Sequence, residues 1–482
     1  MIELYKDLEK VDDYRWIIPK SGNMRVPGLI FSSEKMLNQI FSDEAPVQVK
    51  NAATLPGIVK YSMAMPDIHW GYGLPIGGVI ATNLDDGIIS PGGVGSDINC
   101  GVRMIRTNLS QSDVKNHIKS LISVLFQEIP CGVGSHGRIK LSREDEKKVL
   151  IEGSQWAVKN GYGWTEDVDF TEDRGRLDGA DHSAVSNRAM ERGRDQLGTL
   201  GAGNHFLEIQ VVDKIFNVDI AQKFGIFKDQ ICVMVHCGSR GLGHQVCDDY
   251  LEKMGRAVSK YKIELPDRQL ACAPLNSPEG KEYFSAMKSA ANYAYANRQC
   301  IMHWVRCSFE KVLEQSAEKL GMHLIYDVTH NTAKIEEHSV DGKNMKVCVH
   351  RKGATRSFPA KMPGLPKKYY DIGQPVIIPG DMGRSSFLLV GKDKAMEYSF
   401  GSTCHGAGRL MSRNKAIKIT KGRAIERELE DKGIFVKSRG RETLREEFPE
   451  AYKDVRDVVE VVHNAGLSEK IAQLIPIGVV KG

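Results

Sequence analysis

The sequence of 482 residues lacks the features that define several large classes of protein. No apolar run is long enough to cross a bilayer, which excludes a membrane-spanning helix. Residues 1–9 have neither the basic start nor the apolar centre of a secretory signal peptide. No Pro/Ser-rich linker, low-complexity tract or internal repeat divides the chain. We therefore expect a globular protein that is neither secreted nor bound to a membrane.

Disulfide spacing and strong net charge are also missing. The ten cysteines are scattered without the regular spacing of a disulfide framework, which is typical of free thiols in a reducing cytoplasm. The net charge is only +5, from 66 basic and 61 acidic side chains. This balance permits an anionic partner but does not establish one. Contact with nucleic acid would therefore have to be local, since no basic tail is present.

Both helices and strands are predicted. Apolar residues recur at helical spacing over 112–129. Ser277 and Pro278 form an N-cap followed by proline at the first helical position, and the pattern continues toward Gly321 as one helix or two. Strand-like runs occur at 231–235, 323–328, 346–349, 376–378 and 387–390. These patterns predict a mixed α/β (α+β) fold, with reactive residues at strand ends and in the loops that follow.

Five segments place metal-binding or nucleophilic side chains among glycines and small polar residues. A carboxylate, a thiol and four imidazoles exceed the needs of one closed metal site. The surplus indicates catalysis, with two metals and one histidine left to react. Because the segments are spread along most of the chain, we expect one large domain rather than separable modules. The side chains are Asp97, Cys100, His205, His236, His330 and His405.

Each of these signals is weak when it is taken alone. Taken alone, Cys100 is better explained by a turn that buries a cysteine, and His205 by a structural histidine. His236 leads into a glycine-rich loop with Arg240, which is either a phosphate cradle or an ordinary turn. His405, followed by Gly-Ala-Gly-Arg, has room for a phosphate beside positive charge, which favours a covalent nucleophile. On composition alone, residues 476–482 are predicted to fray.

Longer motifs occur in order along nearly the full length. They are MPDIHWGYG at 65–73, DINCGVR at 97–103, LGTLGAGNHF at 197–206, HCGSRGLG at 236–243, HRKGATR at 350–356 and HGAGR at 405–409. Together they resemble the RtcB family of RNA ligases, which use GTP to join RNA 3′-phosphate or 2′,3′-cyclic phosphate ends to 5′-hydroxyl ends. The resemblance implies a single RtcB-type α/β domain over 1–482 and a role in tRNA splicing or RNA repair.

The resemblance also implies a metal centre with two Mn²⁺ ions per chain. Cys100 would bridge the ions, with Asp97 and His205 on one and His236 and His330 on the other. A thiolate with imidazoles favours zinc on general grounds, because manganese prefers oxygen ligands. Manganese is expected from the resemblance, and oxygens of Asp97 and of a bound nucleotide make it less surprising.

Further roles follow from the resemblance. His405 would carry a covalent guanylate, Arg192 and Arg240 would hold the RNA 3′-phosphate, and Asp67 with His69 would orient or deprotonate the 5′-hydroxyl. Lys481 would bring the apparently frayed tail into the site, whereas Asp381 replaces a serine found in many members. The guanylate pocket would comprise Asn204, His205, Phe206, Leu207, Glu208, His330, Asn331, Pro379, Gly380, Asp381, Met382, Ser386, His405, Gly406, Ala407, Gly408, Tyr452 and Lys481.

Two other functions remain open. A dinuclear phosphatase or nuclease acting on RNA ends would leave His405, Tyr452 and Lys481 without a role. A GTP-sensing or RNA-binding module is disfavoured because every ligand and the nucleophile are present. The lysine of a Lys-x-Asp-Gly motif, used by ligases that activate 5′-phosphates, is missing. The length resembles that of archaeal-type members that use archease as an activator, and we expect a monomer.

Overall fold

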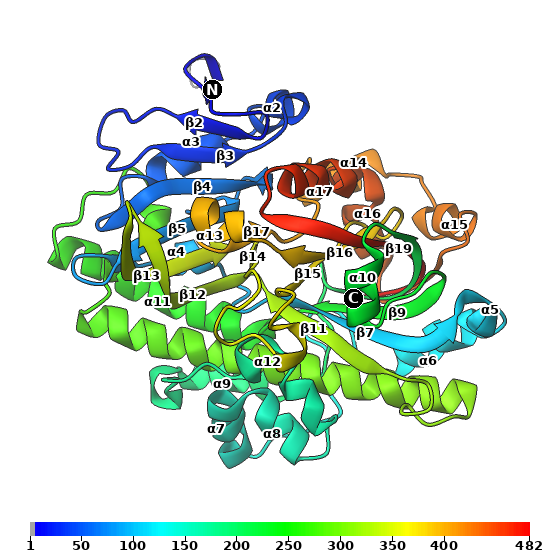
Figure 1. Cartoon of the computed structure of the whole chain (residues 1–482). Helices are drawn as coiled ribbons and strands as arrows, with labels where there is room; N and C mark the ends of the chain where they lie inside the picture. The colour runs from blue at the N-terminus through cyan, green and yellow to red at the C-terminus, as the bar shows by residue number, and fades with distance from the viewer. Residues whose placement is uncertain (1–4) are drawn as a thin grey trace.

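Two β-sheets form the framework of the protein, seen in a computed structural model that describes residues 5–482 (Figure 1). The first four residues of the segment considered above for a signal peptide lie outside the described residues. Within residues 5–482, the first sheet has the strand order β1-β2-β3-β4-β5-β13-β12. The second has the order β11-β7-β9-β8-β19-β16-β15, with β18 beside β19. Most neighbouring strands are antiparallel; β3 with β4 and β18 with β19 are parallel.

The strands that build the two sheets come from distant parts of the chain. The first sheet consists of β1 (Glu9–Lys10), β2 (Arg15–Ile18), β3 (Gly28–Phe31), β4 (Ile58–His69), β5 (Ile76–Asn83), β12 (Asn331–Val340) and β13 (Lys343–Lys352). The second consists of β7 (Gly101–Ser110), β8 (Phe206–Ile215), β9 (Gln230–Cys237), β11 (His323–Thr329), β15 (Pro375–Ile378), β16 (Ser386–Gly391), β18 (Phe435–Ser438) and β19 (Ser468–Lys481).

Two short strand pairs complete the strands of the described residues. They are β6 (Ile88–Ile89) with β10 (Ala273–Pro274), and β14 (Ala354–Arg356) with β17 (Ser402–Cys404). The helices are α2 (Glu34–Ile40), α3 (Ala45–Ala52), α4 (Pro91–Val94), α5 (Gln111–Val114), α6 (Ile118–Glu128), α7 (Arg143–Glu152), α8 (Ser154–Lys159), α9 (Asn187–Arg194), α10 (Val218–Phe224), α11 (Arg240–Lys260), α12 (Pro278–Leu313), α13 (Asp393–Ser399), α14 (Arg413–Ile419), α15 (Ile425–Glu430), α16 (Arg441–Glu446) and α17 (Val455–Asn464).

The mixed α/β prediction is confirmed, and so are all five predicted strands, as parts of β9, β11, β13, β15 and β16. The pattern after Ser277 forms one helix, α12, whose first turn is capped by the Ser277 side chain accepting from Gly280 N. It ends at Leu313, and the C-cap residue Glu314 has a left-handed φ of 53°. Figure 1 shows α12 running across the molecule beneath the sheets.

Two predictions about continuity were wrong. The helix expected over 112–129 is divided into α5 and α6, because His117 N donates to Val114 O (2.8 Å) and closes the first turn. The apolar stripe still faces one core, since Val114 and Leu121 are buried. The tail expected to fray is the end of β19, between β8 and β16. Its proline, which lacks an N–H, sits at a bulge where the register with β8 shifts.

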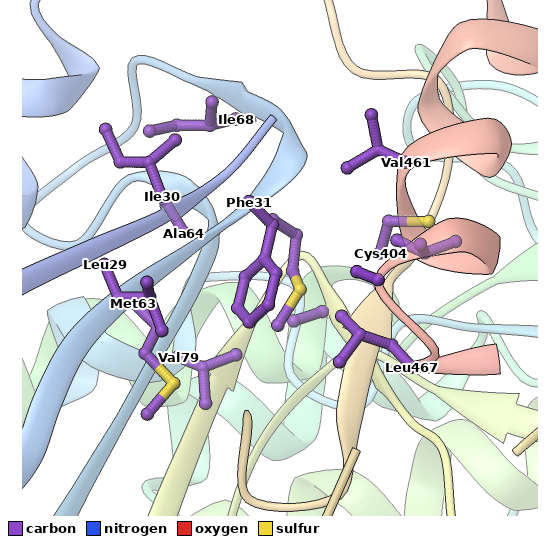
Figure 2. Packing of buried hydrophobic residues seen from close by; sticks show 14 of the residues in the cluster. Leu29, Ile30, Phe31, Met63, Ala64, Ile68, Val79, Cys404, Val461 and Leu467 are labelled. Atoms are coloured by element: carbon purple, nitrogen blue, oxygen red, sulfur yellow. The ribbon is translucent and has the colours of Figure 1, made fainter. Parts of the chain in front are cut away.

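A hydrophobic core joins the first sheet to the C-terminal part of the chain. Figure 2 shows Phe31 between Met63 and Val79 on one side and Val461 and Leu467 on the other. Burial of these side chains is the main force that holds the sheet against α17. Within residues 5–482, no helix combines the length and apolar character needed to cross a membrane. All ten cysteines are free thiols, as their spacing predicted.

Candidate active site

Neighbouring strands of the second sheet bring the predicted metal ligands together. Cys100 directly precedes β7, His205 directly precedes β8, and His236 lies near the end of β9, the strand between them. In the register of the sheet, Val102 of β7 and Phe206 of β8 both lie opposite His236. Three segments that are far apart in the sequence therefore meet where the ends of these three neighbouring strands lie side by side.

His330 is the residue at which the chain passes from one sheet to the other. β11 of the second sheet ends at Thr329, and β12 of the first sheet begins at Asn331. His330 N donates to Cys100 O (2.9 Å), and Asn99 N donates to Asn331 O (2.8 Å). These two backbone hydrogen bonds tie the His330 segment to the Cys100 segment.

The side chains form two ligand groups that share one sulfur. Cys100 Sγ lies 3.3 Å from His205 Nε2 and 3.2 Å from His236 Nε2. His205 Nε2 lies 2.7 Å from Asp97 Oδ2, and His236 Nε2 lies 3.2 Å from His330 Nε2. In each group, Asp97/Cys100/His205 and Cys100/His236/His330, the ligand atoms are all within 4.8 Å of one another. This is the pairing of ligands that the resemblance implied.

Protonation in these groups suits cation binding. His236 Nδ1 lies 3.0 Å from the carbonyl oxygen of Asn204, which only accepts, so Nδ1 carries the proton and Nε2 keeps its lone pair. Burial and the nearby imidazoles hold the pKa of His236 and of His330 well below the usual range. Burial and the Asp97 carboxylate raise the pKa of the Cys100 thiol to about 12. A cation would favour the thiolate, so this donor set fits two metal ions that share one sulfur.

A buried arginine, which the sequence analysis missed, supports the ligand-bearing segments. Arg298 of α12 donates to Asn99 O (2.7 Å) and to Cys237 O (2.9 Å). Its guanidinium also pairs with Asp327 of β11 (2.9 Å). One side chain therefore contacts the residues next to Cys100 and His236 and the strand that leads to His330. The available signal was an arginine within an alanine-rich, buried run of helix.

His405 follows β17 and faces the same centre. Its ring centroid lies 4.8 Å from that of His330. His405 Nδ1 lies 2.7 Å from Asp67 Oδ2, and the same oxygen accepts from His405 N (3.0 Å) and Gly406 N (3.3 Å). Asp67 is fully buried at the end of β4. This contact ties Asp67 to His405, a relation that the sequence analysis did not foresee.

A cavity of about 900 Å³ opens over these groups. Its wall includes His69 and most of the predicted pocket. Five predicted residues do not line the cavity. Cys100 and Asp67 lie behind its wall, and Leu207 and Met382 belong to hydrophobic cores. The fifth, Ser386, accepts a hydrogen bond from Gly380 N. The predicted residues that line the cavity are Asp97, Arg192, Asn204, His205, Phe206, Glu208, His236, Arg240, His330, Asn331, Pro379, Gly380, Asp381, His405, Gly406, Ala407, Gly408, Tyr452 and Lys481.

Comparison with known proteins identifies the family. A family profile described as "tRNA-splicing ligase RtcB" matches residues 48–482. The chain is 55% identical over 477 residues to a protein of Archaeoglobus fulgidus with that name, covering 98% of this chain and 99% of the relative. It is 53% identical over 476 residues to the protein of that name from Thermococcus kodakarensis, with 98% and 99% coverage. The chain belongs to the RtcB family.

In this RtcB-family chain, β8 supplies one wall of the cavity. Phe206 and Glu208 alternate with Leu207, so the first two face the cavity and the third faces the core. Burial raises the pKa of Glu208 to about 7, and Gln210 Nε2 donates to its carboxylate (2.7 Å). Lys481 lies opposite Phe206 in the sheet, with its ammonium 5.7 Å from the ring centroid. The end of the chain is therefore part of the cavity wall.

Asp381 is held by a neighbouring arginine. Its carboxylate pairs with Arg384 Nε (2.5 Å) and accepts from Gly383 N (3.0 Å). Arg384 also donates to Pro449 O (2.6 Å) and Tyr452 O (3.0 Å). The Asp381–Arg384 pair thus anchors the backbone at Tyr452. Burial raises the pKa of Asp381 to about 6.

A second missed residue, Glu447, holds Tyr452 from the other side. The Tyr452 hydroxyl donates to the buried Glu447 carboxylate, and Arg409 Nη1 contacts both Glu447 Oε1 (3.1 Å) and Tyr452 Oη (3.2 Å). Although burial opposes ionisation, the charges of Lys481, Arg409 and Arg413 hold the pKa of Glu447 below its usual range. Cations therefore outnumber the Glu447 carboxylate beside the predicted guanylate pocket.

The two predicted phosphate-binding arginines, Arg192 and Arg240, also line the cavity. Arg240 begins α11 with a left-handed φ of 55° and donates to Thr199 Oγ1 (3.1 Å) and Gly132 O (3.1 Å). Arg192 of α9 donates to Gln245 Oε1 (3.0 Å). Both guanidinium groups are oriented by neutral acceptors. Their positive charge therefore stays available to an anion.

Proposed function

We propose that this protein is an RNA ligase that joins 3′-phosphate or 2′,3′-cyclic phosphate ends to 5′-hydroxyl ends. The observation that carries the proposal is the position of His405, paired with a buried carboxylate and adjacent to two ligand groups that share Cys100. A metallophosphatase or nuclease needs no such histidine. The relatives named as tRNA-splicing ligases make tRNA halves the expected RNA.

Two metal ions would be held by the shared thiolate and its partners. Asp97, Cys100 and His205 would hold one, and Cys100, His236 and His330 the other. Bound there, the metals, by resemblance manganese, supply positive charge that neutralises the phosphates of GTP and RNA.

His405 is proposed as the nucleophile toward GTP. Because a carboxylate oxygen only accepts, Asp67 keeps the proton on Nδ1 and leaves the lone pair on Nε2. Nε2 attacks the α-phosphorus, a nitrogen–phosphorus bond forms, and the bond to pyrophosphate breaks. The Asp67 carboxylate stabilises the positive charge that the imidazole gains. In this scheme Asp67 acts through His405, a role better supported by its contacts than activation of the 5′-hydroxyl.

The later steps move the guanylate to RNA. An oxygen of the RNA 3′-phosphate attacks the guanylate phosphorus and releases His405, so the 3′ end carries an activated pyrophosphate-type linkage. The 5′-hydroxyl then attacks the phosphorus of the RNA end, and GMP leaves. Arg192 and Arg240 would hold the 3′-phosphate, since both line the same cavity as His405. A cyclic phosphate requires prior hydrolysis to the 3′-phosphate.

Glu208 is the residue that we propose selects guanine. Guanine presents two hydrogen-bond donors, N1–H and the 2-amino group. An ionised carboxylate can accept a hydrogen bond from each of them at the same time. Adenine presents an acceptor at N1, which a carboxylate would repel. Glu208 is buried, lines the cavity and has Gln210 to orient it. GTP rather than ATP is therefore the expected co-substrate.

Labelling with [α-³²P]GTP and manganese tests the proposed function. We expect the wild-type protein to retain label after denaturation and His405→Ala to bind GTP without forming the adduct. A label that persists in His405→Ala would refute the assignment of the nucleophile. A wild-type protein that cleaves RNA ends but takes up no label would identify a metallophosphatase or nuclease instead. Repeating the assay with archease tests whether an activator is needed.

A further inference from the structure

The positive charge of the chain is concentrated at one rim of the cavity. Between residues 409 and 447, twelve basic and seven acidic side chains give an excess equal to the whole chain's net charge of +5. Within that segment, residues 410–425 contain no carboxylate at all. They contain five cations: Arg413, Lys415, Lys418, Lys421 and Arg423.

Helix α14 connects this charge to the cavity. Arg409 and Arg413, the latter at the first position of α14, line the cavity. Arg413 lies 3.4 Å from the buried Glu447 carboxylate, yet its side chain is 52% exposed. From there the helix leads away over the surface. Figure 1 shows α14 beside α16, near strand β19 of the second sheet.

One face of α14 is buried and the other presents lysines. Ala416 and Thr420, one turn apart, are buried against the core that includes Leu444 of α16. Lys415, Lys418 and Lys421 are exposed on the rest of the helix and the turn that follows. We call these three lysines the α14 lysine row.

The α14 lysine row is not neutralised within the protein. In the part of the chain that the structure describes, none of its three ammonium groups has a carboxylate within 4.0 Å. The neighbouring Arg423, by contrast, pairs with Glu428 (2.6 Å) and Glu450 (3.1 Å). Three further cations are exposed nearby in the sequence: Lys437 of β18, Arg441 of α16, and Arg439 between these two elements.

A series of unpaired like charges repels itself and attracts a series of anions. The α11 side of the cavity carries mixed charge, because Asp248 lines the cavity there together with Arg192 and Arg240. If the reactive phosphate of an RNA lies in the cavity, the rest of its backbone must leave over a rim. The α14 rim is the one with charge complementary to a row of phosphates.

We propose that the α14 lysine row, with the adjoining cations of β18 and α16, binds the phosphate backbone of the RNA whose end is being joined. This inference rests on the proposed function and adds a substrate-binding surface outside the reactive cavity. Binding there is independent of base sequence, since lysines contact phosphates as point charges. The row therefore contributes affinity, and the cavity decides which ends react.

The test neutralises the row and leaves the cavity intact. The variant Lys415→Gln/Lys418→Gln/Lys421→Gln removes three charges and keeps good helix-forming side chains. A matched control removes three other exposed lysines that do not line the cavity and have no carboxylate within 4.0 Å in the described chain: Lys281→Gln/Lys343→Gln/Lys346→Gln. Both variants have the same net charge, so a general loss of attraction affects them equally.

Fluorescence anisotropy with a 20-nucleotide RNA bearing a 3′-phosphate and a 5′-hydroxyl gives the readout. We expect the α14 variant to bind at least about tenfold more weakly than the control at 0.1 M salt, with a salt-dependence slope reduced by about 2, since about 0.7 is lost per phosphate contact on a single strand. Labelling by [α-³²P]GTP should be equal in both variants, because none of the three lysines belongs to the guanylate pocket.

Equal affinity and equal slope in the two variants would overturn the inference. Unchanged RNA binding with lost binding of an acidic protein partner would overturn it as well and make the row a protein-docking surface. The single charge reversal Lys418→Glu provides an independent check and should weaken RNA binding more than Lys418→Gln. Failure of the proposed function is distinguishable, because it appears as absence of label in the unmodified protein.

Discussion

Replacement of Asp67 by asparagine is a sharp test of how His405 is activated. Three donors point at one carboxylate oxygen, Oδ2: His405 N, Gly406 N and His405 Nδ1–H. An asparagine must place its amide oxygen at that position, because an NH₂ group there would face two backbone N–H groups. Its NH₂ would then occupy the position of Oδ1, which has no hydrogen-bond partner in the described chain. The tautomer of His405 is therefore kept, and only the negative charge is lost.

The cost of losing that charge can be estimated. A carboxylate near an imidazolium is worth about 4 kcal/mol when the effective dielectric constant is about 20. Only part of the positive charge has developed in the transition state, so the loss is about 2 to 4 kcal/mol. At 1.36 kcal/mol per factor of ten, guanylylation should slow by about 30- to 1,000-fold. Asp67→Ala removes the acceptor altogether and frees the ring to adopt the other tautomer, so it should be at least about tenfold slower than Asp67→Asn.

The assay is single-turnover formation of the labelled adduct at saturating GTP and manganese. Circular dichroism and metal content, measured on the same preparations, show whether either variant has lost its fold or its metals. Equal loss in Asp67→Asn and Asp67→Ala would refute the argument that three donors fix the amide. Wild-type rates in both would remove Asp67 from the mechanism.

Three other changes test the site. Cys100→Ser removes a ligand from both proposed metals, so bound manganese by mass spectrometry and guanylylation should fall together; two ions per chain with full labelling would make the cysteine structural. Arg298→Met breaks a buried ion pair and should destabilise the protein by about 3–5 kcal/mol in urea unfolding, with weaker manganese binding; an unchanged midpoint would contradict its anchoring role. Glu208 has a pKa of about 7, so its carboxylate becomes protonated as the pH falls and can no longer accept both hydrogen bonds from guanine. The KM for GTP should therefore rise below pH 7 in the wild-type protein and stay constant with pH in Glu208→Gln. Because the pKa of Glu208 is raised in the folded state, ionisation of its carboxylate lowers the free energy of unfolding as the pH rises from about 4.5 to 7. The free energy of unfolding of Glu208→Gln should therefore exceed that of the wild-type protein by about 3 kcal/mol at pH 8 and by little at pH 4.5.

Local patterns were sufficient to predict individual elements. The N-cap at Ser277 and the strand-like run before Val328 depend on neighbouring residues, and both are found as predicted. The division between α5 and α6 was not predicted, because both helices bury the same apolar stripe and no proline or glycine marks the break. The C-terminal strand was missed because its stability comes from β8 and β16, which composition does not reveal.

The site followed the same division between residue type and long-range placement. Ligand types were recognisable because thiol, carboxylate and imidazole among glycines have few other uses together. Their supports were not, since Arg298 and Glu447 carry charges whose partners lie far away in the sequence. Ser386 stays a prediction for the pocket: its hydroxyl accepts from Gly380 N and Gln210 Nε2, and the residue lies outside the cavity lining.

His330 lies between the two sheets and beside His405, so it connects the predicted metal ligands with the proposed nucleophile. The second sheet presents Cys100, His205 and His236 at one edge, whereas Asp67 belongs to the first sheet and His405 follows a strand outside both. His330, the residue between β11 and β12, is held to Cys100 by its backbone and lies 4.8 Å from the His405 ring centroid. Any shift of one sheet against the other would therefore change the distance between the nucleophile and the metal groups. Packed cores resist such shifts because they deform little. The distance on which the proposed guanylate transfer would depend is thus fixed by the same connection that joins the two sheets.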